Sequence, residues 1–241
     1  MSTPENVNPV PETPGEAAPR EAKAPRKVPP KVPLHKNPFF WGFVVGIVFV
    51  TLMRPLTRHI PEPPPVIAPV PTFSLTNQNG EKFGSDDLRG DIYVANFIFT
   101  RCKGVCPELS RGMAELQERY AREERPMKLV SFSVDPTYDS PEKLAEYAKR
   151  YNADPARWNF LTGDEATVRE LLVKGFGQYL GEKTVNTDNL VDIAHSERFV
   201  LVDYDGNIRG HYSSDADGLD EVFHRSLHVQ REQKIKARHQ G

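Results

Sequence analysis

A continuous run of apolar and uncharged positions covers residues 37–53, NPFFWGFVVGIVFVTLM. A run of about 17 residues is at the short end of the lengths that cross a bilayer. Its aromatic residues Phe39, Phe40 and Trp41 stand at the start, where an interfacial belt would lie. The pattern predicts a single transmembrane anchor over residues 37–54, with a buried core helix and a cleaved signal peptide as the alternatives.

Polar and proline-rich segments flank this run. Residues 1–36 are poor in apolar side chains and predict a disordered cytoplasmic tail, because they cannot bury enough surface to offset the entropy of ordering. Residues 55–71, PLTRHIPEPPPVIAPVP, predict a linker that favours extended polyproline II. Five nearby basic residues precede the run and two follow it, and the more basic side stays in the cytoplasm. The expected location is therefore the bacterial inner (cytoplasmic) membrane, with a periplasmic C-terminal domain.

From residue 72 onward, strand-like and helix-like patterns alternate. Residues 91–100, DIYVANFIFT, are a near-continuous apolar run of the kind that is buried on both faces of a sheet. Residues 127–134, MKLVSFSV, are predicted to form the next strand. A helix is expected between them, with an apolar stripe formed by Leu109, Met113, Leu116 and Tyr120. Strands that alternate with helices predict an α/β domain over residues 72–230, with a central mixed sheet flanked by helices.

The second half of the domain gives weaker patterns. Ser140 before a proline and Asp164 before an apolar stripe are typical helix starts. Residues 177–192 are polar and predict a loop. A last helix is expected over about residues 217–228, and residues 231–241 are predicted to form a basic C-terminal tail.

The composition directs attention to the two cysteines as the candidate reactive or metal-binding residues. The 31 Lys and Arg residues nearly balance the 33 Asp and Glu residues, which gives no case for a nucleic-acid partner. Cys102 and Cys106 are the only cysteines and stand in TRCKGVCP, between an apolar strand and a helix start. A helix N-terminus favours the thiolate form, which is both the nucleophile and the metal ligand. A structural disulfide, a redox-active dithiol and a metal site all remain open, although a disulfide across so short a loop constrains the unfolded chain little.

The identity of a metal depends on a third ligand. Structural zinc needs four Cys or His ligands, and the sequence has no second cysteine pair. Copper(I) prefers soft thiolates and would take a histidine as a third ligand. His195 stands before the apolar run ERFVLVD, where loops at sheet ends place functional groups, but a surface loop histidine is the commoner case. His224 and His228 are four residues apart, which is more typical of a solvated helix face.

Three motifs in order carry a family resemblance. The segments TRCKGVCPELSRGM, SFSVDPTYDSPEKL and AHSERFVLVDYDGNIRGHY resemble the Sco/SenC family of membrane-anchored copper chaperones, over about residues 70–230. The resemblance implies a thioredoxin-like fold, copper ligands at Cys102, Cys106 and His195, and an acid near the site at Asp135. Many members have aspartate where Ala194 stands and proline where Lys103 stands.

The function implied by the resemblance is a metallochaperone. It would hold Cu(I) or Cu(II) and deliver it to an exported copper protein, by resemblance the dinuclear copper site of cytochrome c oxidase subunit II. Movement of residues 178–194 would expose the ion for transfer. The lipid bilayer is the other expected partner, through the single anchor.

Other functions remain open, and with them the question of whether the protein is an enzyme. A thiol–disulfide oxidoreductase or redox sensor would use Cys102 and Cys106 and would need no histidine. A peroxidase is a weaker alternative that rests on Thr100 and Arg101 beside the first cysteine. An assembly scaffold with a vestigial site would not be expected to keep both cysteines.

Overall fold

The computed structural model describes residues 33–57, 62–123, 127–185 and 191–240. The chain divides into two compact units, Met1–His59 and Ile60–Gly241, and each is described by itself. The disordered tail predicted for residues 1–36 falls mostly on residues 1–32, which lie outside the described residues.

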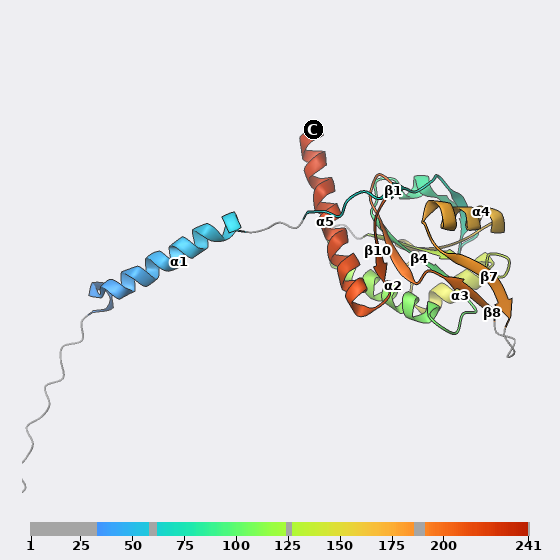
Figure 1. Ribbon diagram of the computed structural model, residues 1–241, viewed down its shortest axis with the longest axis horizontal. Helices are drawn as coiled ribbons and strands as arrows, with labels where there is room; N and C mark the ends of the chain where they lie inside the picture. Colours follow the sequence, from blue (N-terminus) through green and yellow to red (C-terminus); the bar gives the residue numbers. More distant parts are fainter. Residues whose placement is uncertain (1–32, 58–61, 124–126, 186–190, 241) are drawn as a thin grey trace, which may run out of the picture. The chain divides into compact units, whose positions relative to one another are not determined.

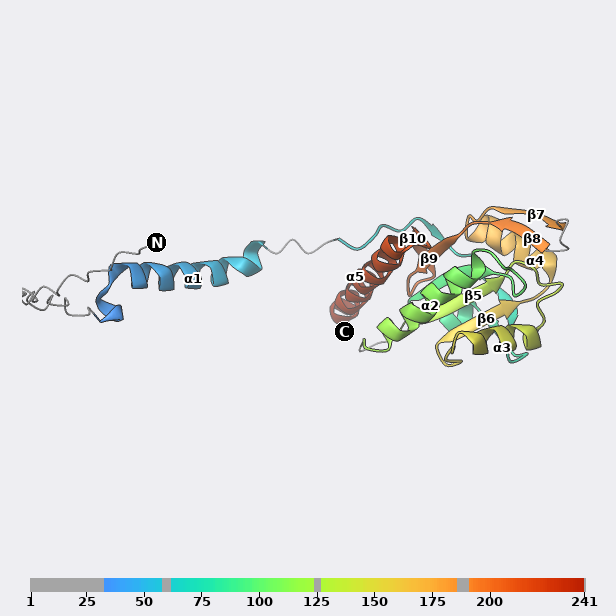
Figure 2. The same ribbon diagram turned by 90° about the horizontal axis from the view of Figure 1, so that it is seen from below.

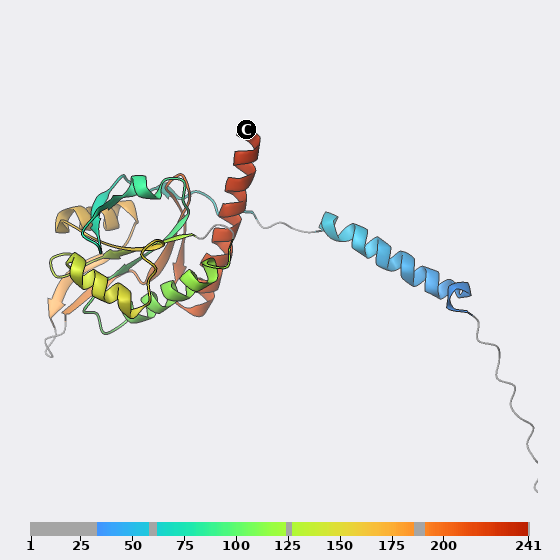
Figure 3. The same cartoon turned by 180° about the vertical axis from the view of Figure 1, so that it is seen from behind.

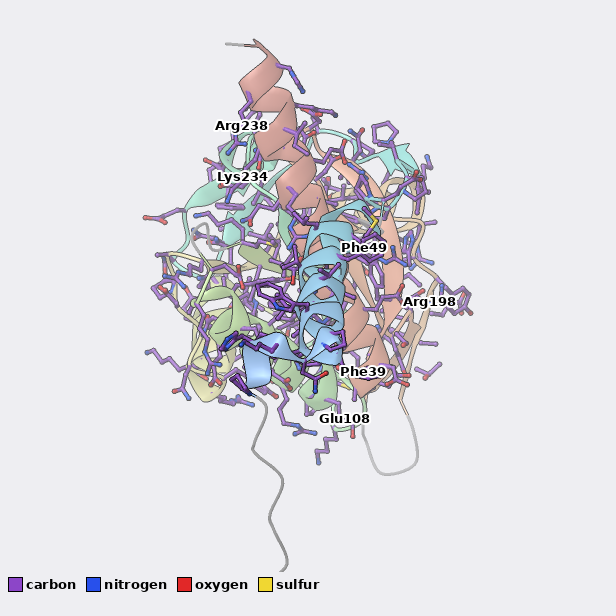
Figure 4. All side chains as sticks on the ribbon, turned by 90° about the vertical axis from the view of Figure 1, so that its left-hand side faces the viewer. Phe39, Phe49, Glu108, Arg198, Lys234 and Arg238 are labelled. Carbon is purple, nitrogen blue, oxygen red and sulfur yellow. The ribbon has the colours of Figure 1, made fainter. Side chains whose placement is uncertain are left out.

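The described part of the first unit is helical. A short 3₁₀ turn at Leu34–Lys36 leads into α1 (Pro38–Thr57), which is drawn in blue in Figure 1. Asn37 begins this helix, because its side-chain Oδ1 accepts a hydrogen bond from the backbone N–H of Phe39 at 3.0 Å. Phe39 and Phe49 carry exposed side chains on α1 (Figure 4).

The structure supports a helix at the predicted anchor but does not support its membrane span. Among the described residues, no helix combines the length and the apolarity needed to cross a membrane. The transmembrane anchor predicted for residues 37–54 is therefore not supported.

The second unit is built on an eight-stranded mixed sheet with the order β1-β10-β9-β4-β5-β6-β2-β3. The strands of this sheet are β1 (Ala68–Pro69), β2 (Ser74–Asn77), β3 (Lys82–Gly84), β4 (Tyr93–Ile98), β5 (Lys128–Ser133), β6 (Trp158–Thr162), β9 (Arg198–Val202) and β10 (Asn207–Ser213). β4, β5 and β6 are parallel neighbours, and β9 runs antiparallel to β4. All residues of β4 are buried, as the apolar run at 91–100 predicts, and all residues of β6 are buried as well.

Helices cover both faces of this sheet. They are α2 (Cys106–Tyr120), α3 (Pro141–Arg150), α4 (Glu165–Glu170) with a π-helical turn at Leu171–Gly175, and α5 (Ala216–Gln240). Figures 1 and 3 show α2 and α3 on one side of the sheet and α4 on the other. The predicted α/β domain with a mixed sheet flanked by helices is confirmed.

Two helix starts follow the capping rules that the sequence indicates. The side chain of Ser140 accepts a hydrogen bond from the backbone N–H of Lys143 at the start of α3, and Pro141 occupies the first helical position. The Asp164 carboxylate accepts from the backbone N–H of Thr167 at 3.0 Å at the start of α4. Both predicted starts are confirmed.

The linker predicted for residues 55–71 is in part attached to the domain. Residues 55–57 end α1, and residues 58–61 lie outside the described residues. Further along, the backbone N–H of Ile67 donates to the carbonyl of Ile208 at 2.8 Å, and β1 pairs with β10. The second half of the linker is therefore an edge of the sheet, because β10 offers unpaired backbone groups there.

The C-terminal helix extends beyond its predicted end. α5 continues through Gln240, so that most of the basic segment 231–241 is helical. Val229 and Gln230 are buried, and Glu232 accepts a hydrogen bond from Arg209 at 2.6 Å, which fastens this part of the helix to the sheet. Lys234 and Arg238 lie on its last turns (Figure 4).

The polar segment predicted as a loop over residues 177–192 is largely a β-hairpin. β7 (Leu180–Val185) pairs antiparallel with β8 (Val191–His195) in a separate two-stranded sheet, and residues 186–190 between them lie outside the described residues. The prediction was wrong because β7 buries little: Leu180 and Gly181 are half-buried, and residues 182–184 are exposed. The alternation of buried and exposed positions that marks a half-buried strand is therefore absent from residues 180–184.

Candidate metal centre

The two cysteines occupy the loop that joins β4 to α2. The backbone N–H of Cys102 donates to the carbonyl of Phe99 at 3.2 Å, which turns the chain directly after β4. Cys106 is the first residue of α2, followed by Pro107 in the first turn, where the missing N–H leaves no helical bond unmade. Neither cysteine is in a disulfide; Cys106 is buried and Cys102 is half-buried.

The two sulfur atoms interact directly. The hydrogen bond with Cys102, together with burial, raises the pKa of Cys106 above its usual range. The sequence favours ionisation of thiols at the helix start, whereas burial beside a second sulfur opposes ionisation of Cys106. A soft metal ion that binds here has to displace the Cys106 proton.

The hairpin brings His195 to the same place. His195 is the last residue of β8, and its Nε2 lies 3.5 Å from Cys106 Sγ. Its Nδ1 lies 3.2 Å from the carbonyl oxygen of Ser196, and its ring meets Phe99 edge-on at 6.0 Å between centroids. Because a carbonyl can only accept, this contact assigns the proton to Nδ1 and leaves Nε2 as the acceptor for the Cys106 thiol.

Of the three predicted ligands, Cys106 is the one that contacts both of the others. It contacts Cys102 on one side and His195 on the other. Among the described residues, however, no group of three or more His, Cys, Asp or Glu is arranged to hold a metal ion as it stands. The ligand set Cys102, Cys106 and His195 therefore stays a prediction, and it requires Cys102 and His195 to converge around Cys106.

Asp135 lies directly beyond β5 and joins two cationic side chains. One carboxylate oxygen accepts from Arg101 Nε at 2.9 Å and from Arg101 Nη2 at 2.6 Å, and the other accepts from Lys183 Nζ at 2.8 Å. Burial opposes ionisation of Asp135, but the hydrogen bonds from Lys183 and Arg101 outweigh it and lower the pKa of the carboxyl group. Asp135 is thus an anion linked to the residue before Cys102, and its role near a metal ion stays a prediction.

Asp139 fastens the start of the cysteine loop. It is fully buried and accepts hydrogen bonds from the backbone N–H and the hydroxyl of Thr100 and from the hydroxyl of Ser133. Burial raises the pKa of Asp139 despite these bonds. Thr100 is thereby directed to Asp139, and Arg101 is directed to Asp135. These contacts weaken the peroxidase alternative, which needs both side chains at the thiol.

The remaining described histidines of the domain lie on other elements. His211 Nε2 is 3.1 Å from the carbonyl oxygen of Phe176, at the base of the segment that leads to β7. His224 and His228 lie on α5, where burial and then the cations Arg231 and Arg225 lower the pKa of His228. A cationic neighbourhood disfavours a metal ion there, in agreement with the solvated face that the sequence indicates.

Lys183 is a residue of this region that the sequence did not single out. It lies within the segment predicted as a loop, 48 positions from its partner Asp135. No motif marks such a pair, because the contact exists only once the hairpin has folded back onto β5.

The fold and the site define the class first: a thioredoxin-like α/β domain in which a cysteine pair at a helix start faces a histidine on a hairpin. A sequence model of the SCO1/SenC family matches residues 64–226. The chain is 31% identical over 173 residues to the SCO1 protein homolog of Bacillus subtilis (strain 168), covering 71% of this chain and 86% of that protein. The protein therefore belongs to the SCO1/SenC family, as its motifs indicate.

Two further relatives bear on the chemistry. A putative copper-binding protein of Stutzerimonas stutzeri is 30% identical over 165 residues, covering 67% of this chain and 78% of the relative. BsSco is a member of the Sco family of cytochrome c oxidase assembly proteins, and a disulfide switch was identified in it. The structure of BsSco is 27% identical in sequence to this chain, with a TM-score of 0.61. That match covers 70% of this chain and 98% of BsSco, and it confirms the thioredoxin-like fold.

Proposed function

We propose that this protein is a copper chaperone. In this proposal Cys102, Cys106 and His195 hold one copper ion, as Cu(I) or Cu(II), and release it to an exported copper protein. The recipient we propose is the dinuclear copper site of cytochrome c oxidase subunit II, in keeping with the oxidase-assembly class of BsSco. The location of the domain in the cell stays a prediction of the sequence.

The observation that carries the proposal is the contact between Cys106 and His195. Two ligands bound to one ion at about 2.0–2.3 Å lie about 3.5 Å apart, and Cys106 Sγ and His195 Nε2 are 3.5 Å apart already. The donor set of two sulfurs and one imidazole nitrogen suits a soft ion such as Cu(I), whereas hard ions prefer carboxylate and carbonyl oxygens. The putative copper-binding protein of Stutzerimonas stutzeri, at 30% identity, supports the same ion.

Release of the ion fits the unequal exposure of the ligands. Cys106 is buried, whereas Cys102 and His195 are half-buried and lie on a loop and on a hairpin that is separate from the main sheet. A thiol of the recipient can therefore approach Cys102 or His195 first and replace the ligands one at a time. In this order of ligand exchange, Cys106 is the last ligand to release the copper ion.

The proposal predicts one copper ion per chain. Titration of the reduced full chain with Cu(I) against a chelator of known affinity is expected to show a single site with sub-micromolar affinity, because thiolate ligands bind soft ions tightly. Oxidised protein with a Cys102–Cys106 disulfide is the matched control, and it should lose this site. Absence of stoichiometric binding by the reduced chain contradicts the proposal.

A thiol–disulfide oxidoreductase is the second candidate, and the direct contact of the two sulfurs favours it. The thiolate of half-buried Cys102 would attack a partner disulfide and form a mixed disulfide, which Cys106 would then resolve. The two thiols of this chain give up two electrons and two protons and become a disulfide, while the partner disulfide becomes two thiols. The disulfide switch of BsSco is consistent with this chemistry.

Replacing His195 with alanine separates the two functions. Loss of a residue that hydrogen-bonds to a metal ligand weakens metal binding by about 10–100-fold. Copper binding is expected to weaken by more than this in the variant, because a ligand itself is lost. Reduction of a small disulfide by Cys102 and Cys106 should continue, since neither sulfur is changed. Equal copper affinity in the variant and in the natural chain would exclude His195 as a ligand.

A further inference from the structure

The hairpin that carries His195 has few attachments to the rest of the domain. β7 and β8 form their own two-stranded sheet and do not pair with the eight-stranded sheet. An isolated two-stranded hairpin is marginally stable at best in water. Figures 1 and 2 show this hairpin at the end of the domain that also carries α4. The contacts that fasten it there decide where the His195 ring lies.

Two attachments hold the base and the inner face of the hairpin. Arg169 of α4 donates from Nη2 to the carbonyl oxygen of Leu180 at 3.2 Å. The side chain of Ile193 is buried and packs in the core. A small cleft nevertheless remains between the hairpin and the body, and Asp135 and Lys183 are among the residues that line it.

A one-residue bulge in β7 sets which side chain crosses this cleft. Leu180 pairs with His195, but Lys183 pairs with Ile193, so the register shifts by one residue between these two pairs. An unbroken ladder from Leu180 would place Glu182 opposite Ile193. Residues directly opposite each other present their side chains on the same face of a strand pair. The bulge therefore turns Lys183, in place of Glu182, toward the inner face beside Ile193.

Lys183 meets an anion on that face. Its Nζ lies 2.8 Å from one carboxylate oxygen of Asp135, while Arg101 occupies the other oxygen at 2.6 Å. The Asp135 side chain is only 2% exposed, and Arg101 directly precedes Cys102. One buried carboxylate thus joins the cysteine loop to the histidine hairpin.

We propose that Lys183 is a positioning residue for the metal site: its ion pair with Asp135 holds the β7–β8 hairpin against the body, so that His195 stays beside Cys106. This inference rests on the proposed copper function and adds a residue that does not touch the ion. Lys183 pairs with Ile193, which lies two residues before His195 on β8. A hairpin that swings away from Asp135 therefore carries the imidazole with it. Arg101 remains on Asp135 when Lys183 is replaced, so the buried carboxylate keeps a cationic partner and the domain is expected to fold.

The first test measures the hairpin without any metal. Hydrogen–deuterium exchange of the amides in β7 and β8 is compared between the natural full chain, Lys183→Met and Lys183→Arg. Loss of a half-exposed ion pair is expected to speed exchange there by about five-fold, and arginine should restore the natural rate. Lys174→Met is the matched control, because it removes a Lys174–Glu170 pair of 2.9 Å outside the hairpin. Unchanged exchange in Lys183→Met overturns the inference.

The second test measures the site. Cu(I) affinity of the reduced full chain is expected to fall by about five-fold in Lys183→Met and to remain natural in Lys183→Arg and Lys174→Met. Faster exchange with unchanged copper affinity would show that Lys183 holds the hairpin but does not position the ligand, which overturns the inference. Failure of the natural chain to bind copper would instead overturn the proposed function, and the exchange test would still decide whether Lys183 holds the hairpin.

Discussion

Cys106→Ser is expected to abolish high-affinity copper binding by the full chain. Cys106 is the side chain that contacts both of the other predicted ligands, with Cys102 hydrogen-bonded to its sulfur and His195 Nε2 at 3.5 Å. A serine hydroxyl is a hard donor that does not ionise near neutral pH, so it cannot replace a thiolate toward a soft ion. The remaining pair, Cys102 and His195, then lacks the thiolate that contacts both of them.

The measurement is the Cu(I) competition titration with Cys102→Ser as the matched variant. Cys102→Ser leaves the Cys106 thiol beside the His195 imidazole, so weakened binding through these two ligands is expected to persist. Cys106 is fully buried, so the unfolding midpoint of each variant is measured to show that the fold is kept. Greater loss in Cys102→Ser than in Cys106→Ser contradicts the central place given to Cys106.

The sequence predicts the domain well where each pattern is local. The apolar runs at 91–100 and 127–134 contain β4 and β5, which are buried between helices, so their residues carry the signal by themselves. Ser140 and Asp164 mark α3 and α4 because a capping side chain acts within three residues of its own position. The fold class follows from the order of such elements.

The candidate site was predictable only in part, because its members meet through long-range contacts. Cys102 and Cys106 are marked by their own spacing, but His195 was singled out by family resemblance, since 89 positions separate it from Cys106. The hairpin that carries it was missed, because its strands are largely polar. Lys183 could not be found at all, because a bulge and not an alternation pattern turns it inward.

A second bulge in the domain places a second cation, and this one is buried. The register of β10 against β9 shifts between Ile208 and Gly210, and Arg209 is the extra residue. Its side chain, only 4% exposed, donates to the carboxylates of Asp203 at 3.0 Å and Glu232 at 2.6 Å. At both places, therefore, a one-residue bulge turns a cationic side chain toward a buried carboxylate.

Arg209 also ties three segments together. Its Nε donates to the carbonyl oxygen of Pro64 at 2.7 Å, so the incoming chain is attached at this point. Asp203 belongs to the turn between β9 and β10, and Glu232 belongs to α5. Removal of Arg209 therefore loosens the incoming chain, the turn and the last part of α5, and it leaves Asp203, only 2% exposed, without its cation.

Arg209→Met is expected to lower the free energy of unfolding by about 3–5 kcal/mol, the usual cost of removing one partner from a buried ion pair. Arg225→Met is the matched control, because Arg225 pairs with Glu221 between half-exposed and exposed side chains of the same helix. An exposed pair contributes at most about 1 kcal/mol, so this control should remain close to the natural chain. Equilibrium unfolding of the full chain in urea measures both variants. Equal losses in the two would mean that burial of Arg209 adds nothing, and that α5 and the incoming chain are held by their backbone and apolar contacts alone.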